Sequence, residues 1–188
     1  MKTKTIETED GSHSLYVEEL DEHYHSTKGA IQESRHVFIK AGLHYTKVNP
    51  VNILEIGFGT GLNALLSILY AEEHSCAINY TAIEKYPLNA QIATELNYAR
   101  LPGDQNNYFE KIHNTAWGTF QPVAPFFNLK KTEADMPAWH SQDTFDLIFF
   151  DAFGPDKQPE MWSQSILNKM YSTLKENGIL VTYSAKGL

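Results

Sequence analysis

The segment that most constrains the fold is Ile-Leu-Glu-Ile-Gly-Phe-Gly-Thr-Gly-Leu-Asn, residues 53 to 63, an apolar run that breaks into three alternate glycines. The apolar residues from Val51 to Ile56 predict a buried parallel strand, and those from Leu62 to Leu69 continue at helical spacing. Glycine has no β-carbon, so the loop between them can turn sharply and admit a ligand at the start of the helix. The segment therefore predicts an α/β fold with a nucleotide-type cofactor at this turn.

The glycine spacing and a nearby acid distinguish between cofactors. A dinucleotide fingerprint is G-x-G-x-x-G, whereas here the third glycine comes one residue sooner. Glu55 can face the cationic amino-acid end of S-adenosyl-L-methionine, but it would repel a pyrophosphate. A simple tight turn remains an alternative for the glycines alone. The cofactor reading predicts that this stretch binds S-adenosyl-L-methionine through Glu55, Gly57, Gly59, Thr60, Gly61 and Asn63.

Two acids follow the next predicted strands. Residues 79–83 are β-prone and end at Glu84, where an acid can bind two vicinal ribose hydroxyls because it offers two acceptor oxygens. Asp135 follows a predicted strand at 126–130, where many methyltransferases contact the adenine amino group. A solvated strand-end acid and a helix cap are the respective alternatives. Both residues are candidates for cofactor binding.

The rest of the chain extends the alternation of strands and helices. It predicts a Rossmann-like class I methyltransferase fold with an open, mostly parallel sheet and ligands at the carboxyl ends of the strands. We expect one domain overall, with residues 1–48 as an amino-terminal extension packed on the cofactor side and 49–188 as the methyltransferase domain. Residues 1–14 read as a frayed tail or edge strand. Further strands are predicted at 145–150 and 178–183, helices at 88–96, 108–117 and 160–174, and a loop at 122–125.

The end of the chain predicts an incomplete sheet. A class I methyltransferase sheet normally ends with two more strands, one of them antiparallel, but the sequence stops at Leu188. We therefore expect the last strands to be lacking in this chain.

Composition narrows the functional classes. The charged amino terminus and the short apolar stretch at 64–71 predict a cytoplasmic protein with no membrane span, which we expect to be a monomer. Cys76 is the one cysteine, and the histidine spacings match no standard site, so we expect no metal. The net charge of −8 argues against a strongly electrostatic grip on nucleic acid, although a local basic patch can coexist with an acidic whole.

A second segment with candidate functional residues, both acidic and aromatic, follows the predicted strand at 145–150. It reads Asp-Ala-Phe-Gly-Pro-Asp-Lys-Gln-Pro-Glu-Met-Trp from Asp151 to Trp162. Its prolines and glycine predict an irregular loop, and Phe153 and Trp162 could stack on a planar base. The alternative is a rigid connection whose aromatic side chains pack into the core.

With these motifs the chain resembles the methyltransferase half of the MnmC tRNA-modifying enzymes and its stand-alone relatives. The resemblance covers most of the chain: Tyr24, residues 32–38 (Gln-Glu-Ser-Arg-His-Val-Phe), 55–63, 84–88 (Glu-Lys-Tyr-Pro-Leu), 151–162 and 184–187 (Ser-Ala-Lys-Gly). The glycine motif is generic to methyltransferases, and the other segments are more specific. The resemblance implies methyl transfer from S-adenosyl-L-methionine to the amine of 5-aminomethyl(-2-thio)uridine at the tRNA wobble position, giving 5-methylaminomethyl(-2-thio)uridine.

The resemblance also has a departure and implies residue roles. We expect no fused FAD-dependent oxidase domain, and we therefore expect a separate enzyme or another route to supply the aminomethyl substrate. Asp151 is the expected catalytic residue, because a carboxylate near the methyl group can orient an amine and stabilise its developing charge. The expected substrate-binding residues are Phe153 and Trp162 against the uracil, Tyr24 closing the pocket, and Arg35 and Lys157 near phosphate.

Two other functions stay open at this point. A small-molecule N- or O-methyltransferase would suit the acidic composition better than tRNA does. A non-catalytic nucleotide-binding module would follow if the missing strands were a natural feature of the protein.

Overall fold

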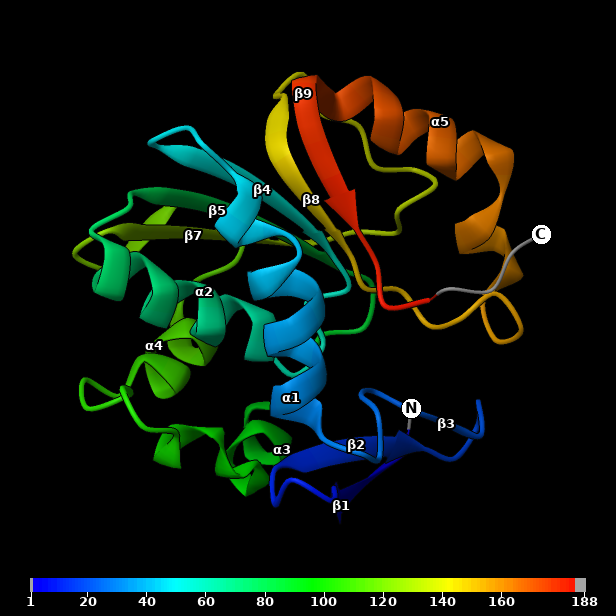
Figure 1. Ribbon diagram of the computed structural model, residues 1–188. Coiled ribbons are helices and arrows are strands. Elements are labelled where there is room, and N and C mark those ends of the chain that lie inside the picture. The colour runs from blue at the N-terminus through cyan, green and yellow to red at the C-terminus, as the bar shows by residue number, and fades with distance from the viewer. Residues whose placement is uncertain (1, 185–188) are drawn as a thin grey trace.

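A six-stranded sheet forms the centre of the computed structural model, which describes residues 2–184 (Figure 1). The strand order is β6-β7-β5-β4-β8-β9, and all neighbours are parallel except β6 and β7. This confirms the Rossmann-like, mostly parallel fold. The strands are β4 (Val51–Ile56), β5 (Ile78–Glu84), β6 (Gln121–Ala124), β7 (Phe127–Glu133), β8 (Phe145–Phe150) and β9 (Leu174–Val181).

The helices cover both faces of the sheet because its central strands are apolar on both sides. Ile53 and Phe149 belong to the core cluster under α2 (Leu62–His74) and α4 (Tyr108–Asn114), whereas Leu54 and Phe150 belong to the cluster under α5 (Gln164–Thr173). Figure 1 shows α5 on the far side of β8 and β9 from α1 (Ala30–Ser34). This arrangement leaves the carboxyl ends of β4, β5 and β8 at one edge of the molecule.

The amino-terminal segment forms a small sheet of its own. Strands β1 (Thr3–Glu7), β2 (His13–Val17) and β3 (Glu22–His23) pair antiparallel. Of the two alternatives for residues 1–14, the edge strand is therefore found, as β1, and the frayed tail is not. Alternation of buried Leu15 and Val17 with the partly exposed Tyr16 explains the pairing, since one face of β2 enters the core. The chain continues through α1, a π-helical turn η1 (Arg35–Lys40) and a 3-10 turn η2 (Leu43–Tyr45) into β4.

Several predicted boundaries were wrong. A loop was expected at 122–125, but Gln121–Ala124 form the antiparallel edge strand β6, where Pro122 is tolerated because an edge strand has one unpaired side. The helix expected at 88–96 is limited to α3 (Ala90–Glu95), followed by η3 (Asn97–Arg100). The helix expected at 160–174 splits into η4 (Pro159–Trp162) and α5, because Ser163 starts α5 with a side-chain cap to Ile166 N.

The family resemblance includes residues 184–187, of which 185–187 lie outside the described residues. Across the described chain, no helix has both the length and the apolarity that a bilayer crossing requires.

Candidate functional site

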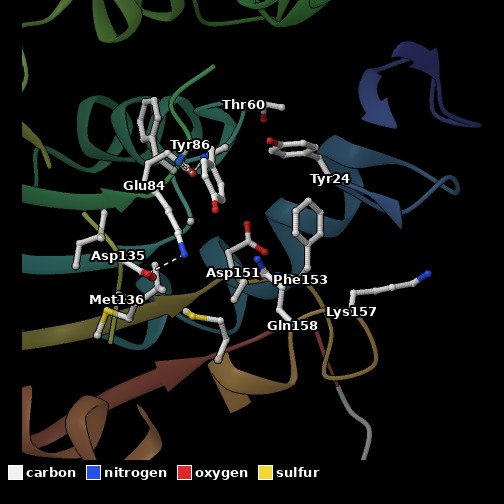
Figure 2. Close-up of a pocket in the computed structure, with 18 of the residues that line it drawn as sticks. Tyr24, Thr60, Glu84, Tyr86, Asp135, Met136, Asp151, Phe153, Lys157 and Gln158 are labelled. Carbon is white, nitrogen blue, oxygen red and sulfur yellow. Dashed lines mark hydrogen bonds and ion pairs between the residues drawn. The ribbon is translucent and has the colours of Figure 1, made fainter. Parts of the chain in front are cut away.

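A cavity of about 310 Å³ lies at the carboxyl ends of β4, β5 and β8. Figure 2 shows Asp151 at its centre, with Glu84, Tyr86 and Asp135 on one side and Tyr24 and Phe153 on the other. The cavity thus takes side chains from the sheet, from the amino-terminal extension and from the loop after β8. Parallel sheets bind ligands at this edge.

The glycine loop brings the backbone close to neighbouring groups. Gly57 adopts a φ of +90°, and a β-carbon there would lie 2.7 Å from the carbonyl oxygen of Asp151. Gly59 adopts a φ of +49°, and a β-carbon there would lie 3.0 Å from the Tyr24 ring. Both conformations favour glycine. The loop therefore lets β4 and β8 meet at Asp151 and lets Tyr24 rest on the loop backbone.

Two carboxylates at the floor of the cavity share one amide. Asn63 Nδ2, in the first turn of α2, donates to Glu55 Oε1 at 3.0 Å and to Asp151 Oδ2 at 2.8 Å. Asn63 lines the cavity, whereas fully buried Glu55 lies beneath it, outside the lining. Asn63 Oδ1 is buried without a hydrogen-bond partner in the described part of the chain, whereas the Glu55 carboxyl interacts with the buried Tyr80 hydroxyl. The floor therefore holds one unused acceptor, on Asn63, next to the space for a ligand.

Both carboxyl groups hold their protons more tightly than usual. Burial raises the pKa of Asp151 to about 8, and the charge of Glu33 adds to this rise against the opposing hydrogen bond from Asn63. Burial, followed by the charge of Asp151, raises the pKa of Glu55 well above its ordinary value. The site consequently suits a cationic ligand, because a positive charge would restore the ionised form.

The acids after β5 and β7 lie where the sequence predicts, on the side of the cavity opposite Tyr24 (Figure 2). Glu84 Oε2 accepts from Gly59 N at 3.0 Å, and Glu84 Oε1 accepts from Tyr86 N at 2.7 Å. Each oxygen keeps a further lone pair for a ligand hydroxyl. Asp135 pairs with Lys85 Nζ at 2.7 Å on the cavity rim.

An aromatic pair forms the opposite wall. The Tyr24 and Phe153 rings meet edge to face, with centroids 5.2 Å apart. Burial, and next the charge of Glu84, raises the pKa of Tyr24, so its phenol stays neutral. Gln158 Oε1 accepts from Phe153 N at 3.1 Å, and Trp162 Nε1 donates to Phe153 O at 2.8 Å. The loop after β8 is therefore held on both sides of Phe153.

Two histidines hold the glycine loop from behind. His25 Nε2 lies 3.5 Å from Thr60 Oγ1, and its Nδ1 lies 3.3 Å from Ser14 Oγ on β2. His113 Nε2 donates to Thr60 O at 3.1 Å. Burial lowers the pKa of each histidine to about 4, so both are neutral near pH 7. The amino-terminal sheet is thus connected to the glycine loop.

A second cavity of about 380 Å³ adjoins the first. It lies between the amino-terminal extension and the loop after β8, and the two cavities share Tyr24, His25, Lys157 and Tyr183. Glu33 lines the second cavity and accepts from Ser26 N at 3.0 Å; burial raises its pKa. Asp151 lines the first cavity, and its charge is felt by Tyr183 in the shared wall. One site therefore has room for two ligands.

Four of the predicted site residues do not line either cavity. Glu55 lies beneath Asn63, and Gly61 is the N-cap of α2. Arg35 is exposed on η1, and Trp162 packs edge to face on Phe150 at 5.0 Å. The lining residues that the sequence predicted are Gly57, Gly59, Thr60, Asn63, Glu84, Asp135, Asp151, Tyr24, Phe153 and Lys157. Lys157 points away from Asp151 (Figure 2), and its Nζ donates to Asp21 O at 2.9 Å.

The lining residues that sequence reasoning missed include His25, Tyr86, Gln158 and Tyr183. Tyr86 comes two residues after Glu84, directly beyond the carboxyl end of β5, where parallel sheets bind ligands, so this position could have been found. The other three depend on how the amino-terminal extension and the loop after β8 meet, for which the sequence offered no periodic signal. Among the described residues, no group of three or more histidine, cysteine, aspartate and glutamate side chains is arranged to hold a metal ion.

Comparison with known proteins connects this geometry to chemistry. A family model described as "S-adenosyl-L-methionine-dependent methyltransferase" matches residues 107–188. The chain is 31% identical over 181 residues to the tRNA 5-methylaminomethyl-2-thiouridine biosynthesis bifunctional protein MnmC of Leptospira interrogans. The matched region covers 89% of this chain and 28% of the Leptospira protein. It is 26% identical to an uncharacterised protein of Methanocaldococcus jannaschii, over 96% of this chain and 50% of the relative.

A solved structure shares the whole architecture. The crystal structure of MNMC2 from Aquifex aeolicus matches with a TM-score of 0.81 and 25% identity, over 98% of this chain and 60% of that one. The chain spans less than a third of the length of the Leptospira MnmC protein. The structural match extends over 98% of this chain, whereas the family model begins after β5, at residue 107.

Proposed function

This chain is an S-adenosyl-L-methionine-dependent methyltransferase related to MnmC, and from that premise we propose that it methylates tRNA. The acceptor is the exocyclic amine of 5-aminomethyl(-2-thio)uridine at the wobble position, and the product is the 5-methylaminomethyl base. The observation that carries the proposal is the position of Asp151, which lines the first cavity close to the wall shared with the second. A carboxylate there can act on an amine brought in beside the methyl donor.

The residues of the first cavity fit the donor. S-adenosyl-L-methionine carries a sulfonium and an ammonium, and the cavity floor offers the Asp151 carboxyl group and the unused Asn63 Oδ1 to such charges, with the Glu55 carboxyl beneath them. Glu84 is the proposed ribose ligand and Asp135 the proposed adenine ligand, with the glycine loop against the sugar. In this proposal Glu55 acts on the donor through Asn63, because Glu55 does not line the first cavity and Asn63 does.

Asp151 carries the proposed chemistry. When bound, S-adenosyl-L-methionine would supply a sulfonium methyl that the lone pair of an amine attacks in line, so that a nitrogen–carbon bond forms while the carbon–sulfur bond breaks and leaves its electron pair on the thioether sulfur. Asp151 accepts a hydrogen bond from the neutral amine, orients its lone pair and takes the proton that nitrogen releases. Its raised pKa of about 8 suits this role, because a base works best with a pKa near the working pH.

The second cavity is the proposed place of the acceptor nucleoside. Tyr24, which lines both cavities, offers ring surface for the uracil, with Phe153 against it on the side of the first cavity, and Tyr183 closes the shared wall. Arg35 and Lys157 remain the proposed phosphate ligands. Trp162 has a supporting role in this proposal, because it holds Phe153 through the backbone instead of facing the cavity.

Transfer of labelled methyl groups tests the proposal. Purified protein is incubated with labelled S-adenosyl-L-methionine and either tRNA bearing the aminomethyl base or a pool of amine and hydroxyl metabolites. We expect label in the wobble nucleoside of the tRNA, identified by mass analysis after digestion. Label confined to the metabolite pool would instead favour a small-molecule N- or O-methyltransferase, which the acidic net charge of −8 would suit.

A deletion strain supplies the test in the cell. We expect wobble uridines there to accumulate the aminomethyl base and to lose the methylaminomethyl base. The proposal includes a separate enzyme that supplies the aminomethyl substrate, and a cytoplasmic, monomeric protein. Donor binding in calorimetry with no transfer to any acceptor would support a non-catalytic nucleotide-binding module.

A further inference from the structure

The surface of residues 35–47 differs in charge from the rest of the chain. No aspartate or glutamate occurs between Glu33 and Glu55, although the whole chain has 23 acids and a net charge of −8. Within that stretch, Arg35, Lys40 and Lys47 are exposed. We define the basic segment as Arg35, His36, Lys40, His44, Tyr45 and Lys47, all of which are exposed.

The three cations of the basic segment have no ion-pair partner among the described residues. By contrast, Lys4 pairs with Glu18 at 2.5 Å and Lys28 with Glu9 at 2.5 Å on the amino-terminal sheet and the turn that follows it. A solvated face usually mixes both signs of charge, so that neighbouring side chains can pair. An exposed, acid-free stretch on an acidic protein is instead suited to a polyanion.

The basic segment also offers an aromatic ring. Tyr45 is 62% exposed, and its ring meets that of His44 at 86° with centroids 6.2 Å apart. Exposed tyrosines beside cations are characteristic of surfaces that stack on unpaired bases and contact the adjoining phosphates. Neighbouring Val48 is also exposed, at 47%.

The inner side of the same segment is held firmly on the sheet. Buried Phe38 packs on Phe149 of β8 with ring centroids 5.2 Å apart, and Leu43 is buried as well. Gly42 leaves no room for a side chain, since a β-carbon would lie 2.5 Å from Phe38 O. The exposed cations therefore project from a rigid support, which lowers the cost of ordering them on binding.

The basic segment begins beside the acceptor side of the site. Glu33 lines the second cavity, and Arg35 follows two residues later on the same run of helix. In Figure 1 this run leaves the amino-terminal sheet at α1 and crosses toward the start of β4. A strand of RNA whose nucleoside enters the second cavity could continue along this surface.

We propose that the basic segment is an RNA-docking surface that holds the phosphate backbone of the acceptor while its nucleoside occupies the second cavity. The inference rests on the proposed tRNA methylation. It adds the surface with which this acidic chain binds RNA. The local charge of +3 from Arg35, Lys40 and Lys47 supplies the attraction that the whole molecule lacks. Tyr45 supplies a stacking surface.

A matched pair of charge variants tests the surface. The test protein carries R35Q, K40Q and K47Q, and the control carries R100Q, K111Q and K130Q, which removes one arginine and two lysines away from both cavities. Affinity for tRNA bearing the aminomethyl base is measured at several salt concentrations. Melting temperature and S-adenosyl-L-methionine binding are measured in parallel to show that both variants are folded.

We expect the test variant to bind tRNA about 10- to 100-fold more weakly than the control. The slope of log affinity against log salt should fall by about 2, from three lost contacts at ~0.7 each on single-stranded RNA. KM for tRNA should rise more than kcat falls. A separate Tyr45→Ala variant should weaken binding about fivefold or more with an unchanged salt slope, since stacking releases no counterions.

The outcomes separate this inference from the proposed function. If wild-type protein methylates tRNA and the test variant binds it as tightly as the control does, the basic segment is a solvated face and the inference is overturned. If wild-type protein neither binds nor methylates tRNA while it retains S-adenosyl-L-methionine, the proposed function fails first and the RNA partner fails with it.

Discussion

The floor of the first cavity and its aromatic wall are built in different ways. On the floor, Glu55, Asn63 and Asp151 stand on strand ends and on the first turn of a helix, and one amide connects both carboxyl groups. The wall consists of Tyr24 and Phe153, which come from the amino-terminal extension and from an irregular loop. Changes on the floor should therefore affect donor binding and chemistry, whereas changes in the wall should affect the acceptor.

The largest effect is expected at Asp151. Asp151→Ala should lower kcat by about 10²–10⁴-fold, the usual contribution of a positioned acid or base. It should change S-adenosyl-L-methionine binding much less near pH 7, because Asp151, with a pKa of about 8, is mostly protonated there in the free protein. Single-turnover methyl transfer and calorimetry measure the two properties. Asp151→Asn is the control that keeps the shape and the contact with Asn63. Turnover close to wild type in both variants would remove Asp151 from the mechanism.

The second effect compares two glycines, one at the floor and one at the wall. Gly57→Ala should destabilise the protein by about 3 kcal/mol, because the φ of +90° is strained for alanine and the new carbon meets the Asp151 backbone. Gly59→Ala should cost only about 1 kcal/mol, since the Tyr24 ring can move aside. Urea unfolding measures both. Equal losses would show that the two sites are equally rigid.

The glycine motif illustrates how much the sequence could predict. Its apolar run, glycine spacing and helical continuation follow local rules of backbone geometry. The sequence therefore predicted the strand β4, the glycine loop and the helix α2 in the correct order. Glu84, Asp135 and Asp151 were placed correctly at the cavity for the same reason, because parallel strands end at one edge. These positions need little information from distant parts of the chain.

The wall depends on contacts between distant segments, and prediction was poorer there. His25 lines the cavity and contacts Ser14 of β2, and Gln158 lines the cavity and accepts a hydrogen bond from Phe153 N. No periodicity encodes either contact. The antiparallel edge strand β6 was missed because Pro122 reads as a loop residue unless the partner strand is known.

The third effect is a pH dependence of donor binding. Asp151 has a pKa of about 8 in the free protein, so below that pH it must lose a proton before it can attract a cation. Affinity for S-adenosyl-L-methionine should therefore rise with pH by up to about tenfold per unit and level off above pH 8.

The reaction product S-adenosyl-L-homocysteine, whose thioether sulfur carries no charge, supplies the comparison. S-adenosyl-L-homocysteine should show a shallower rise, and Asp151→Asn should remove most of the difference between the two ligands. Calorimetry in buffers of different ionisation enthalpy counts the protons released on binding. Identical pH profiles for both ligands in wild-type protein would show that Asp151 does not respond to the sulfonium charge.

The smallest effect distinguishes the two interpretations of Trp162. If Trp162 stacked on the acceptor base, Trp162→Phe would be almost neutral because the ring remains, and Trp162→Leu would be severe. In the structure Trp162 donates to Phe153 O instead, so both variants lose the same hydrogen bond, worth about 1 kcal/mol. KM for the acceptor should then rise about two- to fivefold in each, with kcat and donor affinity unchanged. A large difference between the two variants would place Trp162 at the acceptor and make the wall a direct part of the binding surface.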